Sequence, residues 1–198
     1  GGLFTIDNGT GIVTLANPLD YESGTSHTIT VVATSTDTSS STRDFTITVT
    51  VNPTPLIAAQ TAAICSGDAF LIAPVDASPV TIVPAGTTYA WAAPVVTGGI
   101  TGGSAQTAQP NITQTLINPT NTVQTATYTV TPTSGAAGAC IGADFTITVT
   151  VDPTPVITAQ TATICSGDAF LIDPVDASPT TIVPAGTTYT WAAPVVTG

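Results

Sequence analysis

Positive charge is almost absent from this sequence. It contains one arginine (Arg43), no lysine and a single histidine (His27) against 12 acidic residues, so the net charge is −11. Such a surface repels the phosphates of nucleic acids and the headgroups of anionic lipids. Long apolar runs are absent as well, because Thr, Gly and Pro interrupt every stretch that approaches the ~20 residues of a membrane-spanning helix. We therefore expect neither nucleic-acid binding nor membrane insertion.

The residue combinations that most enzymes require are also missing. Nucleophilic and acid–base catalysis need a nucleophile beside a tunable base, and the only histidine, His27, begins a threonine-rich stretch where we expect an exposed strand residue. No HExxH, GxSxG or CxxC motif occurs, and no glycine-rich phosphate loop is followed by lysine. We therefore predict that the chain is not an enzyme and has no cofactor, with calcium as the one alternative.

Helical periodicity is absent, and 17 glycines with 16 prolines interrupt any helix that could start. Instead, apolar and polar residues alternate with a period of two. This alternation is clearest at 45–51, where Phe45, Ile47, Val49 and Val51 lie on one face and threonines on the other, and it recurs at 145–151. The chain is therefore predicted to be all-β.

A long internal repeat organises the sequence. The stretch 44–98 returns at 144–198, 100 residues later, and only seven of 55 positions differ: Asn52/Asp152, Leu56/Val156, Ala58/Thr158, Ala63/Thr163, Ala73/Asp173, Val80/Thr180 and Ala90/Thr190. A fixed period marks an array of one structural unit, and about 100 residues is the size of one β-sandwich. We therefore predict tandem β-sandwiches.

Proline-rich joints at 52–55 and 152–155 divide the chain. They predict the second half of one domain (1–53), one complete domain (54–153) and the first half of another (154–198). A half-sandwich exposes its apolar face and strand edges. Two alternatives follow: the polypeptide continues in a longer protein, or neighbouring chains complete the halves by strand donation.

Turn signals place the expected strands between them. In the first part we expect strands at 3–6, 12–15, 27–33 and 44–51. In the complete domain we expect strands at 56–60, 62–65, 69–72, 87–91, 111–116, 126–131 and 144–151.

The three cysteines suggest a disulfide bond within the complete domain. Cys65 and Cys165 are repeat equivalents, so Cys65 and Cys140 are the only pair within one domain, and Cys165 would pair outside the sequence given. A disulfide closing about 75 residues would contribute roughly 4.5 kcal/mol and imply an oxidising, extracytoplasmic location. Three buried free thiols are the alternative. Tyr89 and Trp91 share one face of their strand, and the indole is expected to pack on the bridge, as in immunoglobulin-like cores.

The first part of the chain resembles the second half of a cadherin repeat. The pattern F-x-I-D-x-x-T-G-x-I, L-D-Y-E, V-x-A is met at Phe4, Ile6, Asp7, Thr10, Gly11, Ile12, Leu19 to Glu22, Val31 and Ala33. The resemblance implies calcium binding at Glu22. However, Thr34-Ser35-Thr36 stands where the family has an acidic residue, so a full calcium cage is not expected.

The Tyr-x-Trp alternation, the Cys-Ser-Gly-Asp turn, Leu-x-Asn-Pro and the Tyr-Thr-Val-x-Pro strand within 54–153 resemble the PKD-like repeats of large Bacteroidetes surface proteins, including gliding-motility adhesins. The resemblance implies immunoglobulin-like sandwiches in an elongated array at the cell surface, and export by the type IX system.

The remaining acidic residues are more typical of turns than of a catalytic or calcium-binding site. Asp68 and Asp76 lie in loops that the repeat copies as Asp168 and Asp176. Aspartate is a common turn residue, and a weak calcium contact through Asp68 or Asp76 is the alternative.

We expect a structural shaft segment of an adhesin or surface filament, whose partners are neighbouring repeats and other copies in a filament. A carbohydrate-binding module for surface glycans is the second hypothesis, with Tyr21, Tyr128 and Trp91 as candidate aromatic platforms.

Overall fold

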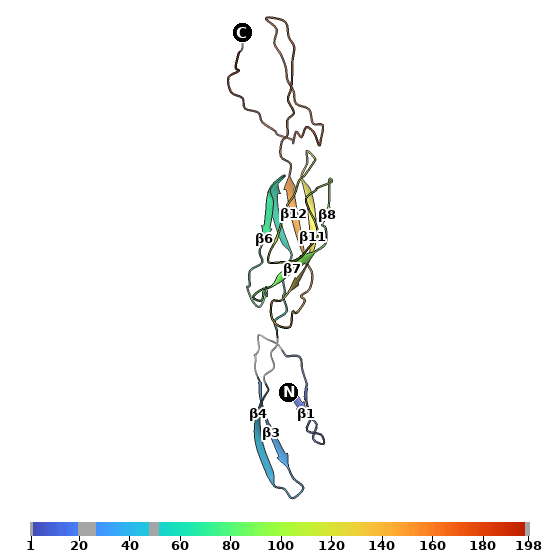
Figure 1. Cartoon of the computed structure of the whole chain (residues 1–198), viewed down its shortest axis with the longest axis vertical. Helices are drawn as coiled ribbons and strands as arrows, with labels where there is room; N and C mark the ends of the chain where they lie inside the picture. Colours follow the sequence, from blue (N-terminus) through green and yellow to red (C-terminus); the bar gives the residue numbers. More distant parts are fainter. Residues whose placement is uncertain (1, 20–26, 48–51, 197–198) are drawn as a thin grey trace.

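The computed structural model describes residues 2–19, 27–47 and 52–196, and for residues 43–47 it describes the backbone alone. Every regular element in these ranges is a β-strand, which confirms the predicted all-β class (Figure 1). Within the same ranges there is no helix of the length and hydrophobicity needed to cross a membrane.

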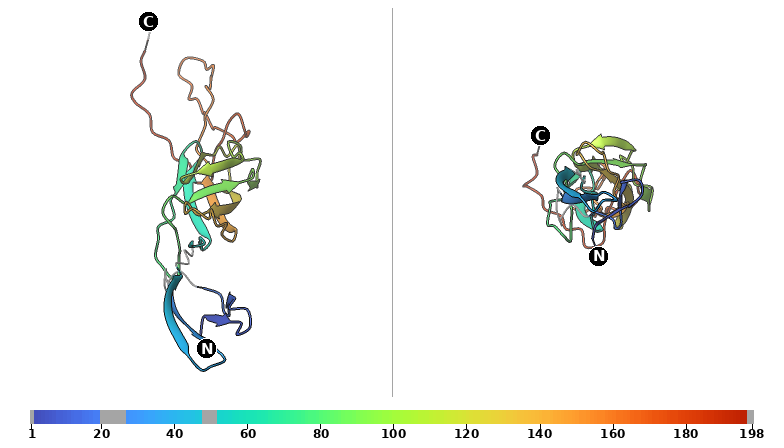
Figure 2. Two further views of the ribbon diagram at one scale, coloured as in Figure 1. Left: turned by 60° about the horizontal axis from the view of Figure 1, so that its bottom comes forward. Right: turned by 90° about the horizontal axis from the view of Figure 1, so that it is seen from below.

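Residues 54–153 form a two-sheet sandwich. Its larger sheet has the order β5–β12–β11–β7–β9, with the short β8 on β11, and its second sheet pairs β6 with β10. The layers are seen from two sides in Figure 2. The strands are β5 (Gln60–Cys65), β6 (Ala69–Ile72), β7 (Thr88–Trp91), β8 (Val95–Val96), β9 (Gln106–Gln109), β10 (Ile112–Thr115), β11 (Gln124–Thr133) and β12 (Phe145–Asp152).

The core of this sandwich is continuous and closed. Strand β12 lies between β5, which runs parallel to it, and β11, which runs antiparallel. The alternation predicted for this strand is confirmed, because Phe145, Ile147, Val149 and Val151 are all buried. Across the interior, the rings of Phe70 on β6 and Tyr128 on β11 approach to 5.4 Å between centroids.

Three points of the strand prediction in this domain need correction. Residues 56–59 are not a strand, since Leu56 makes only an isolated bridge to Ile82, and Gln60 already belongs to β5. Conversely, the two-residue strand β8 was missed, and so was β9, whose Gln-Thr-Ala-Gln sequence has no apolar alternation and whose pairing with β7 arises from the tertiary fold. Strand β6 has the predicted bounds.

The first part of the chain contains two separate hairpins. Strand β1 (Phe4–Ile6) pairs with β2 (Val13–Leu15), and β3 (His27–Thr34) pairs with β4 (Ser40–Ile47). Strand β4 begins four residues before the predicted start at Asp44. The cause is the tight turn before it, where the Asp37 carboxylate accepts hydrogen bonds from the Ser39 amide (3.0 Å) and hydroxyl (2.6 Å).

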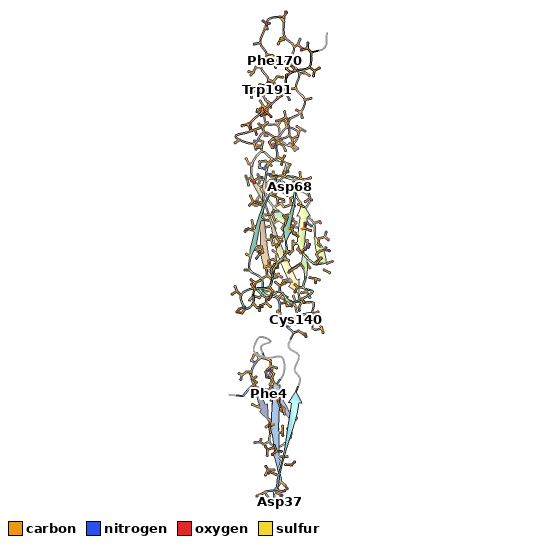
Figure 3. All side chains as sticks on the ribbon, turned by 90° about the vertical axis from the view of Figure 1, so that its left-hand side faces the viewer. Phe4, Asp37, Asp68, Cys140, Phe170 and Trp191 are labelled. Carbon is orange, nitrogen blue, oxygen red and sulfur yellow. The ribbon has the colours of Figure 1, made fainter. Side chains whose placement is uncertain are left out.

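The partial copy behaves differently from the sequence that it repeats. Residues 154–196 contain no strand, only isolated bridges between Val156 and Ile182 and between Ala177 and Thr181. Phe170 is 66% exposed, whereas its equivalent Phe70 is 2% exposed, and Trp191 is 87% exposed against 5% for Trp91. These side chains lie on a segment without a covering sheet (Figure 3).

Candidate functional site

The cysteines do not form the predicted disulfide. Cys65 pairs with Asp152 at one end of the sandwich, whereas Cys140 lies before the start of β12, at the other end; Figure 3 labels Cys140 and Asp68 at these two ends. The strand β12 between them is eight residues long, ~25 Å at the usual rise, and a disulfide tolerates less than ~7 Å between Cα atoms. All three thiols are free. The alternative of three buried thiols is also wrong, because Cys65 and Cys165 are exposed.

The end of the sandwich that carries Cys65 holds the outgoing joint. The Ser66 amide donates to the carbonyl of Asp152 (2.8 Å), and the Thr154 hydroxyl donates to the carbonyl of Ser66 (3.0 Å). Two consecutive parts of the joint are thus bonded to the turn that follows β5. Sequence reasoning assigned this Cys-Ser-Gly-Asp turn only to the fold, although its repetition beside a proline-rich joint was a usable signal.

Asn118 anchors that turn to the core. Its side chain is fully buried, and its Nδ2 donates to the carbonyls of Thr122 (2.8 Å) and Val151 (3.0 Å). Its Oδ1 accepts from the Thr120 amide (2.9 Å), and its backbone amide donates to the Ser66 hydroxyl (2.9 Å). A buried amide with all of these partners fixes the loop geometry. The joint is therefore connected to the end of β12 through Ser66 and Asn118.

The opposite end of the sandwich holds the incoming joint. The Cys140 thiol lies 3.7 Å from the carbonyl oxygen of Asn52, and Pro55 is fully buried. Gly138 and Gly142 permit this approach, because a Cβ at Gly138 would collide with the Asn52 side chain and one at Gly142 with the Pro55 carbonyl. The incoming joint thus packs closely on the loop that precedes β12.

The acidic candidates make ordinary turn contacts. Asp76 Oδ1 accepts from the Val83 amide (2.8 Å) and the Ser78 hydroxyl (3.0 Å), and the bond from Val83 lowers the pKa of this carboxyl. Asp176 repeats these contacts with its own copies of both residues. The Asp68 amide closes the turn by donating to the Cys65 carbonyl (3.0 Å). In the described ranges no three His, Cys, Asp or Glu side chains gather in a way that could hold a metal ion.

The aromatic candidates for a glycan platform are in the core. Tyr128 is fully buried and donates its hydroxyl to Gln114 Oε1 (2.9 Å), and burial raises its pKa to about 12. Trp91 is also buried, as expected from its position beside Tyr89. Neither ring can stack on a sugar. Tyr21 and the calcium candidate Glu22 lie outside the described residues.

The first part of the chain contains a groove. It has a volume of about 570 Å³ and lies between the β1–β2 hairpin and the residues 29–34 of β3. His27 is half-buried, contrary to the expected exposed position, and its ring packs edge-on against Phe4 with 5.7 Å between centroids. His27 is not among the described residues that line the groove, and the one carboxylate among them, Asp7, accepts hydrogen bonds from the Thr10 amide (2.7 Å) and hydroxyl (2.8 Å) of its own turn.

Comparison with known proteins supports both sequence resemblances. The model of the PKD-like domain matches residues 62–155, and the model of the cadherin domain matches residues 1–52. A search of curated proteins gave no match. Domains of these two types are typical of extracellular proteins and fit adhesive or structural-repeat roles.

Proposed function

We propose that the chain is a shaft segment of an extracellular repetitive adhesin or surface filament. The observation that carries the proposal is the joint, which packs on the sandwich at both ends. The outgoing joint is bonded to Ser66, and the incoming joint packs on Gly138, Cys140 and Gly142. A joint held in this way transmits orientation from one domain to the next.

The composition of the joint supports the same role. Each joint contains two prolines, which fix φ and restrict bending. The arrangement in Figure 1, where the three parts follow one another along the longest axis, is consistent with an extended array. With roughly 30–40 Å per domain from strand rise and loops, the number of repeats would set the reach of the shaft.

The surface charge supports shafts that remain separate from one another and do not associate side by side. Net charge of −11 with a single arginine gives neighbouring shafts surfaces of the same sign. The motif resemblance within 54–153 extends the proposal to the surface adhesins of the Bacteroidetes, in which such a shaft would present binding domains away from the cell during gliding motility.

The proposal can be tested on two copies of residues 54–153 joined end to end. Each copy contains the whole closed core described above. Small-angle X-ray scattering under reducing conditions should give one sharp maximum dimension of about twice the domain length. The matched control carries four glycines inserted after Pro153 of the upstream copy, and its distance distribution should broaden. Identical, broad distributions for both proteins would rule out a stiff joint.

A second candidate role is a polymer completed by strand donation between chains. It is favoured by the exposed apolar side chains of 154–196 and by the identity of 44–51 with 144–151, the strand on which the complete domain closes. Residues 160–165 of one copy would then pair with the 44–51 sequence of the next, as β5 pairs with β12. Sedimentation of the 198-residue chain should show mass increasing with concentration, and Phe170→Asp should suppress the increase. A monomer at every concentration excludes this role.

A further inference from the structure

The two cysteines of the complete domain border the same position of the joint from opposite sides. Residues 52 and 152 are repeat equivalents. The carbonyl of Asp152 accepts a hydrogen bond from the Ser66 amide of the upstream sandwich (2.8 Å), next to Cys65. The carbonyl of Asn52 lies 3.7 Å from the sulfur of Cys140 in the downstream sandwich. A carbonyl oxygen has two lone pairs, so one joint can make both contacts at once.

This geometry brings the cysteines of successive repeats together. Where one repeat follows another, the downstream sulfur and the upstream Ser66 amide nitrogen both contact one oxygen. Their separation is therefore at most about 6.5 Å, the sum of the two distances. Cys65 is directly bonded to that nitrogen. A disulfide then requires that the two Cβ atoms lie about 4 Å apart, and at that spacing rotation about χ1 brings the two sulfurs into bonding distance.

We infer that Cys65 of each repeat forms a disulfide with Cys140 of the repeat that follows it, across the joint. The inference rests on the proposed shaft, because it requires consecutive repeats. It accounts for the exposure of Cys65 at the end of the sandwich that carries the outgoing joint. Residues 1–53 contain no cysteine, so the bond joins one PKD-like repeat to the next and not the cadherin-like part to the first repeat. The bond joins successive sandwiches beside the 152–155 segment, so it limits the separation of the domains under load.

The chemistry requires an oxidant of the low-molecular-weight disulfide class, such as oxidised glutathione. The thiolate of one cysteine attacks a glutathione sulfur and releases one reduced glutathione, which leaves a mixed disulfide. The second cysteine attacks the protein sulfur of that mixed disulfide and releases the second glutathione. Two protein thiols lose two protons and two electrons, and one glutathione disulfide becomes two thiols.

The test uses the same two-repeat protein, equilibrated with oxidised glutathione and a large excess of reduced glutathione, so that a cysteine without a protein partner stays a thiol. The protein has four cysteines, and we expect one disulfide and two free thiols per monomer. Peptide mapping should join Cys65 of the upstream copy to Cys140 of the downstream copy. Replacing these two by serine should leave two free thiols and no bond. The matched control, Cys140→Ser upstream with Cys65→Ser downstream, should retain the bond. Circular dichroism checks that each variant keeps its sheet structure.

Four free thiols after equilibration would overturn the inference, as would a bond mapped within one repeat or between two molecules. These results leave the shaft proposal in place if scattering of the reduced protein still shows a stiff joint. A flexible joint with the mapped bond present would instead contradict the shaft and retain the disulfide. The two failures are therefore distinguishable.

Discussion

Phe70 and Phe170 occupy the same position in two nearly identical copies, and the structure predicts opposite responses to one substitution. Phe70 is 2% exposed and packs on the Tyr128 ring, whereas Phe170 is 66% exposed. Truncating a buried phenylalanine to alanine removes its apolar area and leaves a cavity, at a cost of about 3–5 kcal/mol. Loss of the ring–ring contact is part of this cost. A largely exposed residue changes stability by about 0.5 kcal/mol or less.

Phe70→Ala should therefore lower the free energy of unfolding of the complete sandwich by about 4 kcal/mol, and Phe170→Ala should leave it nearly unchanged. The two variants share their flanking sequence, so each is the matched control of the other. With a urea dependence of about 2 kcal/mol per molar, the midpoint should fall by about 2 M in the first variant alone.

Tryptophan fluorescence during urea unfolding measures this difference. The chain has two tryptophans, of which Trp91 is 5% exposed and Trp191 is 87% exposed. In a Trp191→Phe background the emission therefore reports on the complete sandwich. Equal midpoint shifts for Phe70→Ala and Phe170→Ala would refute the reasoning, because they would mean that the two copies are packed alike. A shift in the Phe170 variant that depends on protein concentration would instead support strand donation.

Three further predictions concern residues of the complete sandwich. Raising the pH from 9 to 11 should cost it about 1.4 kcal/mol through Tyr128. The unfolded tyrosine ionises near pH 10, whereas burial raises the folded pKa to about 12, so stability is lost as the pH rises between these two values. Urea midpoints measured at pH 9 and pH 11 should show this loss in the unsubstituted protein and not in Tyr128→Phe. Asn118→Ala should lower the free energy of unfolding of the complete sandwich by about 3 kcal/mol, because it leaves the Val151 carbonyl without its buried donor. Thermal unfolding measures this change, and a decrease below about 1 kcal/mol would contradict the anchoring role of Asn118. Gly102→Ala should lower the stability of the sandwich far more than Gly67→Ala. Both glycines have positive φ, but only at Gly102 would a Cβ collide with the Thr115 carbonyl. Equal urea midpoints for the two variants would contradict this difference.

Local sequence is sufficient for some parts of the structure. The loop around Asp76 recurs at Asp176 with the same hydrogen bonds, although only the first copy belongs to a closed sandwich. The bridge between Leu56 and Ile82 likewise recurs between Val156 and Ile182. Both contacts lie within the copied stretch itself, so they form without the partners that 99–153 supplies to the first copy. For the same reason the alternation at 145–151 and the turn at 66–68 could be predicted from the sequence.

Other features depend on segments far away in the chain. Residues 60–65 form β5 because β12 lies beside them, and the equivalent residues 160–165 form no strand. Strand β9, whose sequence is polar, exists through its pairing with β7. The pairing of Cys65 with Cys140 was wrong for a related reason: both belong to one domain, but the parallel pairing of β5 with β12 places them at its opposite ends.

The sequence by itself thus determined the repeat, the strand alternation, the turns and the proline-rich joints, since these depend on neighbouring residues. Only the tertiary structure decided which copy buries its aromatic residues, which ends of the sandwich carry the thiols and how the joints are held. A β-strand is stabilised by partners that are distant in sequence. Phe70, Tyr89 and Trp91 are therefore buried where 99–153 covers them, whereas their equivalents Phe170, Tyr189 and Trp191 remain exposed, because no covering strands are present beside 154–196 in the described part of the chain.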